Sequence, residues 1–579
     1  MQPRMSKRWV VKEQITPEVR EELAAYPTFF QQILFARGIT TADQAKAYID
    51  CSLSSVTDPL TMKGMAEAVA CLMDAIDRDI PIAVYGDYDV DGVTATALMT
   101  LVLRQFGAQA IPYIPNRFDE GYGLNVEAIK KLADDGIKLI VTVDCGIRSP
   151  AEARLAQELG VQMVISDHHH PAEELPAACA VICPKQEGCE YAEKDLSGVG
   201  LAYKIAQALV NARPNAGVCA EDYLDLVALG TVADVVPLVG ENRVLVRQGL
   251  ARMRARMIHD RPGLLALANV ARVNALSVTA TDVAFMLGPR LNASGRLETA
   301  MRSLELLMAT DRGLAGVWAQ ELDDQNRKRQ EMTRKTQEAA AVKAQAGDGG
   351  AGGQDILFAF DETFNPGVVG LAASRLVEMY YRPAVVGVIE NGVARASCRS
   401  IPEFHITEAL DGCRHLMERH GGHALAAGFT IKTENLPQLI DCLREAARNK
   451  LAGQDLRPML RADAEVRLEE LRHPDFMRYL DMLQPTGQGN SEALFVSRNV
   501  KVLDVRYMGA EKQHAKLKVE VPGGRGVLDV VCFRQAEKAA ALKRGEPIDV
   551  MYHYERNEFN GIVTPQMNAR DFKPSGMAD

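Results

Sequence analysis

Short hydrophobic runs alternate with helix-like patterns between about residues 60 and 240. The runs are rich in β-branched residues, and the stretches between them carry apolar residues at helical spacing. We expect helices at Met65 to Arg78 and Thr94 to Phe106, and strands at Ile80 to Tyr85, 139–144 and 162–167. Alternation of strands and helices is typical of βα units around a parallel sheet. The region is therefore predicted to be an α/β domain built on a parallel sheet.

The pattern changes twice after residue 300. Residues 301–346 are polar and helix-favouring, which predicts a long connecting helix, and the glycine-rich 347–355 follows as a flexible joint. A second α/β domain is predicted next, with helices at Val368 to Tyr380 and Pro437 to Lys450 and a strand at Pro383 to Ile389. Short alternating runs at 494–572 predict a small β-barrel. The predicted division is an N-terminal segment at 1–60, a parallel-sheet domain at 61–300, the connecting helix at 301–346, the second α/β domain at 347–455 and the barrel domain at 456–579.

Composition narrows the class of protein without identifying it. Hydrophobic residues at 47% and charged residues at 25% are ordinary for globular domains, so wholesale disorder is not expected. No window approaches 18 consecutive apolar residues and the first residues lack an apolar signal core, so we expect a cytoplasmic protein with no membrane span. The net charge of −10 means that nucleic-acid binding would need local basic surfaces. The 11 scattered cysteines fit reduced thiols better than a complete disulfide framework.

Acidic residues follow the predicted strands of the first domain. Asp87, Asp89 and Asp91 come directly after one strand, while Asp144 ends a second and Asp167 ends a third. Because the carboxyl ends of parallel strands share one edge of the sheet, these groups should converge. His168, His169 and His170 follow Asp167, and Asp234 interrupts a later apolar run. The alternatives for the first triplet are a solvated acidic loop, or capping of the following helix by Asp91.

Converging carboxylates and imidazoles favour bound divalent cations. Three like charges at a strand end repel one another, and cations offset that repulsion. Carboxylates alone favour Mg²⁺, whereas an added neutral histidine shifts the preference toward Mn²⁺. Two such ions roughly 3.5 to 4 Å apart activate water and stabilise a leaving oxygen in phosphoryl chemistry. Asp144 is the natural bridge between them, because its strand should lie between the other two ligand groups. Glycosidase chemistry needs only two carboxylates and would leave the histidines unused.

Four of these motifs, in order, resemble those of the DHH phosphoesterase superfamily: DYDVDG (87–92), VTVDCG (141–146), SDHHH (166–170) and GTVADVVPL (230–238). Four more resemble the bacterial single-stranded-DNA exonucleases of that superfamily: PNRFDEGYGL (115–124), LGPRLNASGRL (287–297), GVVGLAASRL (367–376) and GGHALAAGF (421–429). The resemblance covers most of residues 60–572. It implies a DHH domain, a long connecting helix, a DHH-associated substrate-binding domain and a C-terminal OB-fold β-barrel, in agreement with the division above.

The resemblance also implies an activity and its partners. The expected reaction is 5′ to 3′ degradation of single-stranded DNA to 5′ mononucleotides with two Mg²⁺ or Mn²⁺ ions, in DNA repair and recombination. A monomer assisted by single-strand binding protein and a helicase is expected. The alternatives are a phosphodiesterase of oligoribonucleotides or cyclic dinucleotides, and a noncatalytic DHH replication scaffold. Retention of every acidic motif weighs against the scaffold.

By the same resemblance, the metal ligands carry over to Asp89, Asp91, Asp144, His168 and Asp234, with Asp87 standing where relatives can carry a histidine ligand. Asp144, His168 and His169 are the expected catalytic residues, with His169 beside the leaving group. Val90 and Cys145 depart from the usual Ala and Asn, but neither removes a ligand.

The remaining expected residues concern the substrate. Ser397 and Arg399, together with Arg290 and Asn292, resemble contacts to a terminal phosphate, which an arginine can bind bidentately. Gly421, Gly422 and His423 offer unobstructed backbone N–H groups for a phosphodiester backbone.

Three further sets of residues are left open by the sequence. The aromatics of the barrel could be core or a stacking platform: Tyr507, Phe533, Tyr552, Tyr554 and Phe559. Two basic clusters could meet phosphates or be solvated helix faces: Arg252, Arg254, Arg256 and Arg261, and Arg327, Lys328 and Arg329. Three cysteines lack the paired spacing of a zinc ribbon and are expected to be incidental thiols: Cys179, Cys183 and Cys189.

Overall fold

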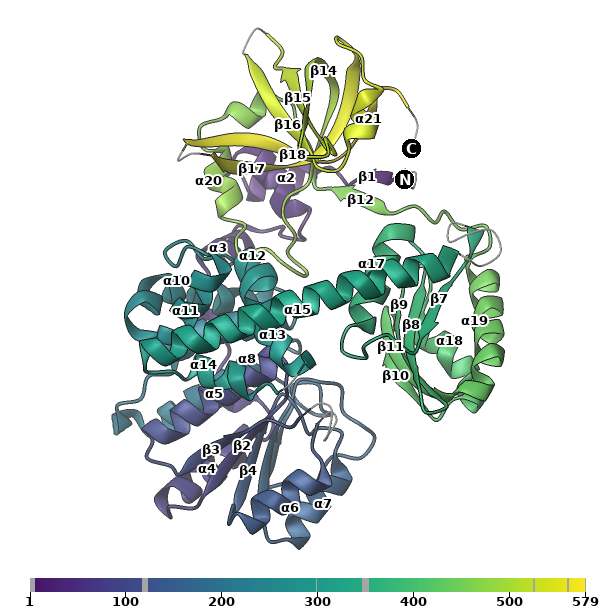
Figure 1. The fold of residues 1–579 in the computed structure, drawn as a ribbon. Coiled ribbons are helices and arrows are strands. Elements are labelled where there is room, and N and C mark those ends of the chain that lie inside the picture. Colours follow the sequence, from purple (N-terminus) through teal and green to yellow (C-terminus); the bar gives the residue numbers. More distant parts are fainter. Residues whose placement is uncertain are drawn as a thin grey trace. The chain divides into compact units, whose positions relative to one another are not determined.

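A computed structural model describes most of the chain, namely residues 6–116, 123–297, 299–345, 353–523, 526–559 and 562–577. The chain forms two compact units (Figure 1). The larger unit comprises Trp9–Pro289, Ala300–Ala319 and Met459–Asp579, and the smaller comprises Met1–Arg8, Arg290–Thr299 and Gln320–Pro458.

A five-stranded parallel sheet organises the first part of the larger unit. Its strand order is β3-β2-β4-β5-β6, and every neighbouring pair is parallel. The strands are β2 (Ile82–Gly86), β3 (Ala110–Tyr113), β4 (Leu139–Val143), β5 (Gln162–Ser166) and β6 (Ala180–Ile182). Strands β2 and β4 are buried along their whole length, which explains their continuous hydrophobic runs. The predicted parallel-sheet α/β domain is confirmed.

Helices cover both faces of this sheet. On one face, α6 (Val126–Asp134) and α7 (Pro150–Glu158) share a core with the sheet (Figure 1). On the other face pack α4 (Met65–Asp77), α5 (Val90–Gln105) and α8 (Gly198–Ala212). The apolar run before Asp234 forms helix α9 (Leu224–Ala233), which packs against α5, α8 and α10 (Gly240–Asp260).

A closed barrel forms the C-terminal part of the larger unit. Its strands are β13 (Ala464–Glu465), β14 (Phe495–Met508), β15 (His514–Glu520), β16 (Val527–Cys532), β17 (Pro547–Phe559) and β18 (Ile562–Pro574). The sheet runs β13-β14-β15-β16-β18-β17, and pairing of β14 with β17 closes its last five strands. The predicted OB-fold β-barrel is confirmed. Its core also contains Phe30, Ile33 and Leu34 from helix α2 (Thr28–Phe35), so N-terminal residues and the barrel are buried together.

The smaller unit holds a second, mostly antiparallel sheet of order β10-β11-β9-β8-β7. Its strands are β7 (Leu357–Asp361), β8 (Ala384–Glu390), β9 (Val393–Arg399), β10 (Arg419–His423) and β11 (Ala426–Lys432). Helix α17 (Val369–Tyr380) packs in one core with β7 and β8, while α18 (Ile406–Gly412) and α19 (Leu436–Leu451) share another with β9 and β11. The predicted second α/β domain is confirmed.

The other elements complete the order along the chain. The polar segment expected as one connecting helix contains α14 (Met301–Leu307) and the long α15 (Arg312–Gln345), with a break between them. The remaining helices and strands are α1 (Pro17–Glu22), α3 (Ala42–Asp50), α11 (Pro262–Ala271), α12 (Ala280–Asp282), α13 (Gly288–Leu297), α20 (Phe476–Asp481), α21 (Ala536–Ala540), β1 (Arg8–Val11) and β12 (Met459–Ala462).

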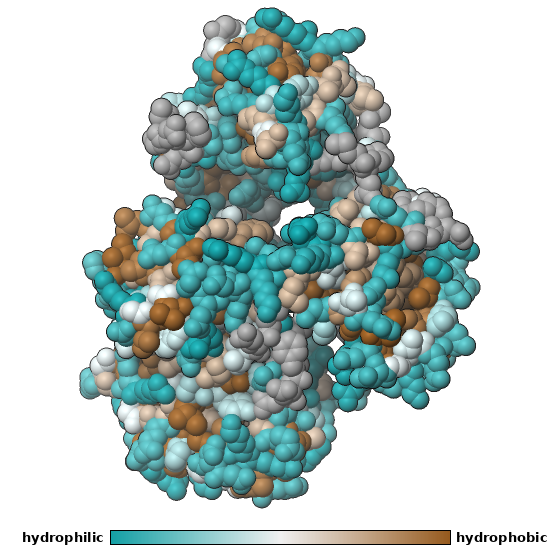
Figure 2. All heavy atoms as spheres, viewed as in Figure 1, coloured by the Kyte–Doolittle hydropathy of each residue, from teal (hydrophilic) through white to brown (hydrophobic). Residues whose placement is uncertain are grey.

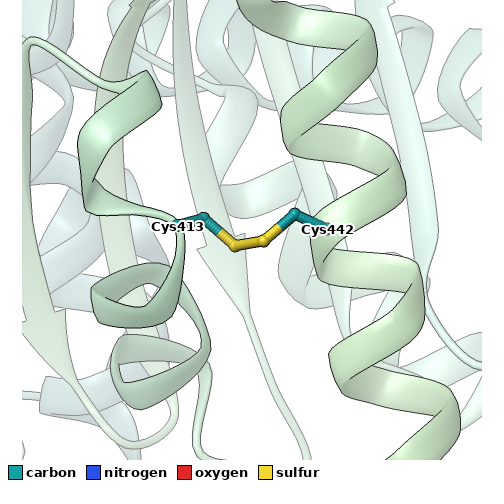
Figure 3. Close-up of a disulfide and its surroundings, with 2 residues drawn as sticks. All are labelled: Cys413 and Cys442. Carbon is teal, nitrogen blue, oxygen red and sulfur yellow. A yellow bond between two sulfur atoms is a disulfide. The ribbon is translucent and has the colours of Figure 1, made fainter.

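Two cysteines of the smaller unit form a disulfide. Cys413, which ends α18, is bonded to Cys442 of α19, with their Cα atoms 6.5 Å apart (Figure 3). The other nine cysteines are free. The expectation of reduced thiols is therefore wrong for this pair, because packing of α18 against α19 brings two distant positions within bridging distance.

The surface gives one further observation. Figure 2 shows hydrophilic residues over most of the visible face, with hydrophobic residues in separate patches. None of the helices in the described ranges combines the length and the apolar character that crossing a bilayer requires.

Candidate metal centre

The acidic residues lie where the parallel sheet predicts, at the carboxyl ends of its central strands. Asp87 follows β2, Asp144 follows β4, and Asp167 with His168 follows β5. Strand β4 lies between β2 and β5, so Asp144 has the other two groups on either side. The central position expected for Asp144 is confirmed by this strand order.

Asp89 and Asp91 divide two tasks at the start of α5. Asp89 is the helix cap, because its Oδ1 accepts hydrogen bonds from the backbone N–H groups of Asp91 and Gly92 at 3.0 and 3.1 Å. The suggestion that Asp91 caps the helix is therefore wrong. Asp91 is 1% exposed and accepts hydrogen bonds from the backbone of α8, at 2.6 Å from Gly198 and 2.9 Å from Val199. The turn requires glycine at 92, since a Cβ there would lie 2.5 Å from the backbone oxygen of Asp87.

Unusual backbone conformations hold the other two carboxylates. Asp144 has φ +63°. Asp234 caps the C-terminal end of α9, and the next residue, Val235, has φ +65°. A β-branched residue rarely adopts this left-handed region, so the surrounding packing must enforce it. Gly198 packs directly on Asp144, because a Cβ at 198 would lie 2.5 Å from the Asp144 Cβ. The fold thus fixes both carboxylates at some conformational cost.

His168 is the meeting point of three carboxylates. Its Nε2 lies 3.1 Å from Asp144 Oδ1, 3.6 Å from Asp234 Oδ2 and 3.8 Å from Asp91 Oδ2. The ligand atoms form three overlapping groups, each with its atoms within 4.8 Å of one another: Asp144, His168 and His169; Asp91, His168 and Asp234; and Asp87, Asp89 and Asp144. The structure therefore brings together all seven residues that the sequence predicted as metal ligands or catalytic residues.

The site contains polar atoms that the fold leaves unsatisfied. Both ring nitrogens of His168, Asp144 Oδ1 and Asp234 Oδ2 are buried and make no hydrogen bond to the described residues. Buried polar atoms are nearly always hydrogen-bonded in folded proteins. An exception shared by three neighbouring side chains, all with oxygen or nitrogen ligand atoms, fits bound divalent cations. The residues present thus match the Mg²⁺ or Mn²⁺ site expected from the sequence.

The electrostatics of the cluster point the same way. Burial, reinforced by the neighbouring carboxylates, raises the pKa of Asp91 and Asp144 well above the ordinary range. Burial and the charge of Asp89 raise the pKa of Asp234 to about 7. Burial lowers the pKa of His168 to about 3, so its imidazole is neutral, as metal ligation requires. The carboxylates can ionise together only if cations compensate their charge.

Asp167, which the sequence analysis did not include among the site residues, lies against His169 in the structure. Its carboxylate accepts hydrogen bonds from the backbone N–H of Ile147 and of His169, each at 3.0 Å, and lies 2.7 Å from His169 Nδ1. Although burial opposes charge on both, the hydrogen bond between them raises the pKa of His169 and lowers that of Asp167. Asp167 thus orients the imidazole of His169 beside the metal ligands. The signal was present, because Asp167 ends a strand as Asp144 does.

Ser397 and Arg399 lie together in the smaller unit. They occupy alternate positions of β9, so both side chains emerge on one face of the strand. Both reach Gly370 in the first turn of α17, since a Cβ on that glycine would be 3.2 Å from Arg399 Nη2 and 3.3 Å from Ser397 Oγ. A helix N-terminus with an arginine and a hydroxyl beside it is a favourable environment for a phosphate group.

Arg290 and Asn292 lie on the part of α13 that belongs to the smaller unit. Arg290 Nε donates a hydrogen bond to Asp323 Oδ1 at 2.9 Å. The ion pair holds the guanidinium in a fixed orientation, with only 12% of the side chain exposed.

Gly421, Gly422 and His423 lie on β10, the edge strand of the second sheet, and all three are exposed. A Cβ on Gly421 would meet no atom within 4 Å, so the fold itself does not require glycine there. Gly422 differs, because its φ is +146° and a Cβ would lie 2.4 Å from the oxygen of Ala426.

The structure also decides the residues that the sequence left open. In the first basic cluster Arg252 and Arg256 pair with Asp222, Arg261 pairs with Asp225 at 2.7 Å, and Arg254 donates a hydrogen bond to the Val278 carbonyl. In the second cluster Arg327 pairs with Asp323 at 2.7 Å.

The barrel aromatics separate into two kinds. Tyr552 and Tyr554 are buried in the core, whereas Tyr507 and Phe533 are 46% and 48% exposed. The side chain of Phe559 lies outside the described residues. Among the described side chains, Tyr507 and Phe533 therefore remain as stacking candidates.

Cys179, Cys183 and Cys189 belong to none of the possible metal-binding groups among the described residues.

Three family models match successive parts of the chain. They are described as the DHH family N-terminal domain (residues 81–231), the DHHA1 domain (339–449) and the RecJ OB domain (462–571). The first contains the metal centre except for Asp234, and the second contains Ser397, Arg399 and the β10 glycines.

Whole-length relatives carry one shared name. The single-stranded-DNA-specific exonuclease RecJ of Bacillus subtilis (strain 168) is 38% identical over 570 residues, covering 97% of this chain and 70% of that protein. Its namesake from Escherichia coli (strain K12) is 34% identical and covers 93% of this chain and 94% of its own length. The crystal structure of RecJ in complex with Mn²⁺ from Thermus thermophilus matches with a TM-score of 0.84 at 29% identity, over 98% of this chain and 80% of that one. A Mg²⁺ complex of the same protein matches with a TM-score of 0.78 at 28% identity, over 98% of this chain and 79% of that one.

Proposed function

Because the chain belongs to the RecJ family and is a metal-dependent exonuclease of single-stranded DNA, we propose that it releases 5′ mononucleotides from the 5′ end by a two-metal mechanism. The observation that carries the mechanism is the convergence of Asp91, Asp144 and Asp234 on the unsatisfied Nε2 of His168. When bound, two divalent cations would ionise the attacking water and stabilise the leaving oxygen.

The protein's own residues have distinct roles in this proposal. Asp144 belongs to two of the three ligand groups and follows the central strand, so it is the residue to share between two ions. Asp87 and Asp89 would hold one ion with it, while Asp91, His168 and Asp234 would hold the other. Their rigid backbone positions fix the geometry before substrate arrives.

His169 supplies a proton in the proposed reaction. Asp167 holds the imidazole through Nδ1, which leaves Nε2 to donate its proton to the departing 3′ oxygen. Burial of Asp167 prevents water from competing for this contact, and only 3% of its side chain is exposed.

The smaller unit is proposed to bind the DNA strand. Arg399, Ser397 and the first turn of α17 form the terminal-phosphate site, in which a 5′-phosphate accepts hydrogen bonds from guanidinium, hydroxyl and backbone groups. Arg290 and Asn292 add polar contacts from α13. Gly421 and Gly422, with His423 beside them, let a phosphodiester approach the backbone of an exposed edge strand.

The biological setting follows from the family. We propose a cytoplasmic monomer that acts in DNA repair and recombination on strands delivered by a helicase and single-strand binding protein. Size-exclusion chromatography with light scattering checks the first part, and a mass near the 63.3 kDa of one chain is expected.

Digestion of end-labelled DNA and RNA, with Mg²⁺ or Mn²⁺, tests the activity. A 5′ label on single-stranded DNA should appear at once as mononucleotide, whereas a 3′ label should pass through progressively shorter strands. Early release of a 3′ label would contradict the polarity. Activity confined to short RNAs or cyclic dinucleotides would support the alternative phosphodiesterase, and no turnover of any phosphoester would support a scaffold.

A further inference from the structure

A short segment after β6 reaches the metal centre from the edge of the sheet. Strand β6 is parallel to β5, with Ser166 aligned to Ile182, so the residues that follow each strand emerge at the same edge. The backbone N–H of Asp167 donates to the Ile182 carbonyl at 3.0 Å, and the Cys183 thiol donates to the His169 carbonyl at 3.4 Å. The segment therefore lies directly against the loop that carries the two histidines.

The backbone of this segment is fixed in place. Gln186, only 5% exposed, donates its side-chain amide to the carbonyls of Val181 at 2.8 Å and Lys63 at 3.3 Å. Its backbone N–H closes a turn onto the Cys183 carbonyl at 3.1 Å. Lys185 lies inside this braced turn, and only 18% of its side chain is exposed.

The ammonium of Lys185 contacts the segment that packs on the metal ligands. Its carboxylate neighbour is Asp195, whose Oδ1 lies 3.6 Å from Nζ and whose side chain is 61% exposed. Asp195 stands three residues before Gly198, whose backbone N–H donates to Asp91 and which packs directly on Asp144. An ion pair to so exposed a carboxylate contributes little to stability. Among the described residues, this mostly buried ammonium thus has one weak anionic partner.

Metal binding changes the electrostatic attraction that the Lys185 ammonium experiences from the metal ligands. Without ions, the carboxylates around His168 attract the ammonium. Divalent cations bound to the same carboxylates cancel that attraction and repel the Lys185 ammonium. The ammonium is then free to pair with another anion that enters the site. The substrate of the proposed function brings such an anion, because each phosphodiester carries a negative charge to the metal centre.

We propose that Lys185 is a substrate-binding residue of the nuclease site, whose ammonium exchanges Asp195 for a non-bridging oxygen of the phosphodiester being cleaved. This inference rests on the proposed function and adds to it a direct protein contact with the reacting group. The ammonium stabilises the charge that develops on the phosphoryl oxygens, as a positioned donor does in other enzymes. Asp195 holds the ammonium until the substrate arrives.

Two variants and a matched control test this role in the full-length protein. Lys185→Met removes the charge at similar length, Lys185→Arg retains it, and Lys63→Met removes a lysine whose contact is the carbonyl of Glu187 in the neighbouring loop. We measure kcat/KM on a 5′-phosphorylated single-stranded oligonucleotide at saturating Mn²⁺, its dependence on salt concentration, and Mn²⁺ affinity by calorimetry.

Lys185→Met should lower kcat/KM by about 100-fold, the effect of losing one positioned donor. The slope of log kcat/KM against log salt should become shallower by about 0.7, as for one lost phosphate contact to a single strand. Mn²⁺ affinity should be unchanged or tighter, because a neighbouring positive charge is removed. Lys185→Arg should recover most of the activity, and Lys63→Met should match the wild type.

The outcomes distinguish failure of the proposed nuclease function from failure of the proposed role of Lys185. If the wild type fails to degrade single-stranded DNA, the proposed function is wrong. If the wild type is active and Lys185→Met equals Lys63→Met, or if its defect disappears with more Mn²⁺, the role of Lys185 is overturned. If Lys185→Met melts early, Lys185→Gln replaces it and is judged by the same slope and affinity.

Discussion

The buried carboxylate of Asp234 makes the metal-free protein sensitive to pH, and Asp234→Asn tests this. Folding raises the pKa of this group from 3.8 to about 7, because burial and Asp89 oppose its ionisation. The folded state therefore binds more protons than the unfolded state between these two values. Stability must then fall as pH rises from about 4 to about 7, and the penalty is complete above pH 7.

The size of the penalty follows from the shift. About three pKa units at 1.36 kcal/mol each give an upper bound of about 4 kcal/mol for the ionised group. Asparagine has nearly the same shape and carries no charge. In EDTA, Asp234→Asn should therefore melt near the wild-type temperature at pH 4.5 and several degrees above it at pH 8. Mn²⁺ at 1,000 times its Kd should remove this advantage at pH 8, because it stabilises the wild type by about 4.1 kcal/mol.

Thermal melting followed by circular dichroism, with and without Mn²⁺, measures both effects. Asp77→Asn is the matched control, since Asp77 is an exposed carboxylate paired with Arg213 at 2.7 Å. In EDTA, Asp77→Asn should gain no stability relative to the wild type as pH rises. If Asp234→Asn differs from the wild type by the same amount at every pH, or is less stable in EDTA at pH 8, the account of the buried carboxylate cluster is refuted.

Three further predictions concern the chemistry and the substrate. Asp167→Asn should bind Mn²⁺ with near wild-type affinity in calorimetry. Its kcat should fall by about 10- to 100-fold, because His169 loses its orienting carboxylate. A large loss of Mn²⁺ affinity would contradict this role. Gly421→Ala should melt at the wild-type temperature, since the added Cβ meets no atom within 4 Å. It should raise KM for single-stranded DNA by about tenfold, which corresponds to about 1.4 kcal/mol. An unchanged KM would show that this glycine does not contact the substrate. Arg399→Met should abolish the preference for a 5′-phosphorylated over a 5′-hydroxyl strand in a competition assay, and a retained preference would assign the terminal phosphate elsewhere.

Much of the site was predictable because it depends on local rules. Buried strands read as continuous hydrophobic runs, and each run that ended in an acidic residue placed that residue at one known edge of the sheet. The central position of Asp144 needed only the expectation that its strand lies between the strands of the other two ligand groups, as it does. The alternation in 494–572 likewise predicted the barrel, since strand spacing and glycine turns are visible in sequence.

The features that sequence did not decide depend on distant neighbours. Asp89 and Asp91 look equivalent in DYDVDG, but only the backbone of Gly198 and Val199, more than a hundred positions later, selects Asp91 for the buried site. From the sequence, Arg261 could have bound a DNA phosphate. In the structure its guanidinium pairs with the carboxylate of Asp225. The closeness of Cys413 and Cys442 arises from helix packing, for which no local pattern exists.

The central claim is that Asp87, Asp89, Asp91, Asp144, His168 and Asp234 hold two divalent ions around a shared Asp144. Crystals grown with Mn²⁺ and measured at the manganese absorption edge test it most directly. Two anomalous peaks roughly 3.5 to 4 Å apart, both in contact with the carboxylate of Asp144, are predicted. A single peak, peaks that leave Asp144 unligated, or no peak in this cluster at saturating Mn²⁺ would contradict it.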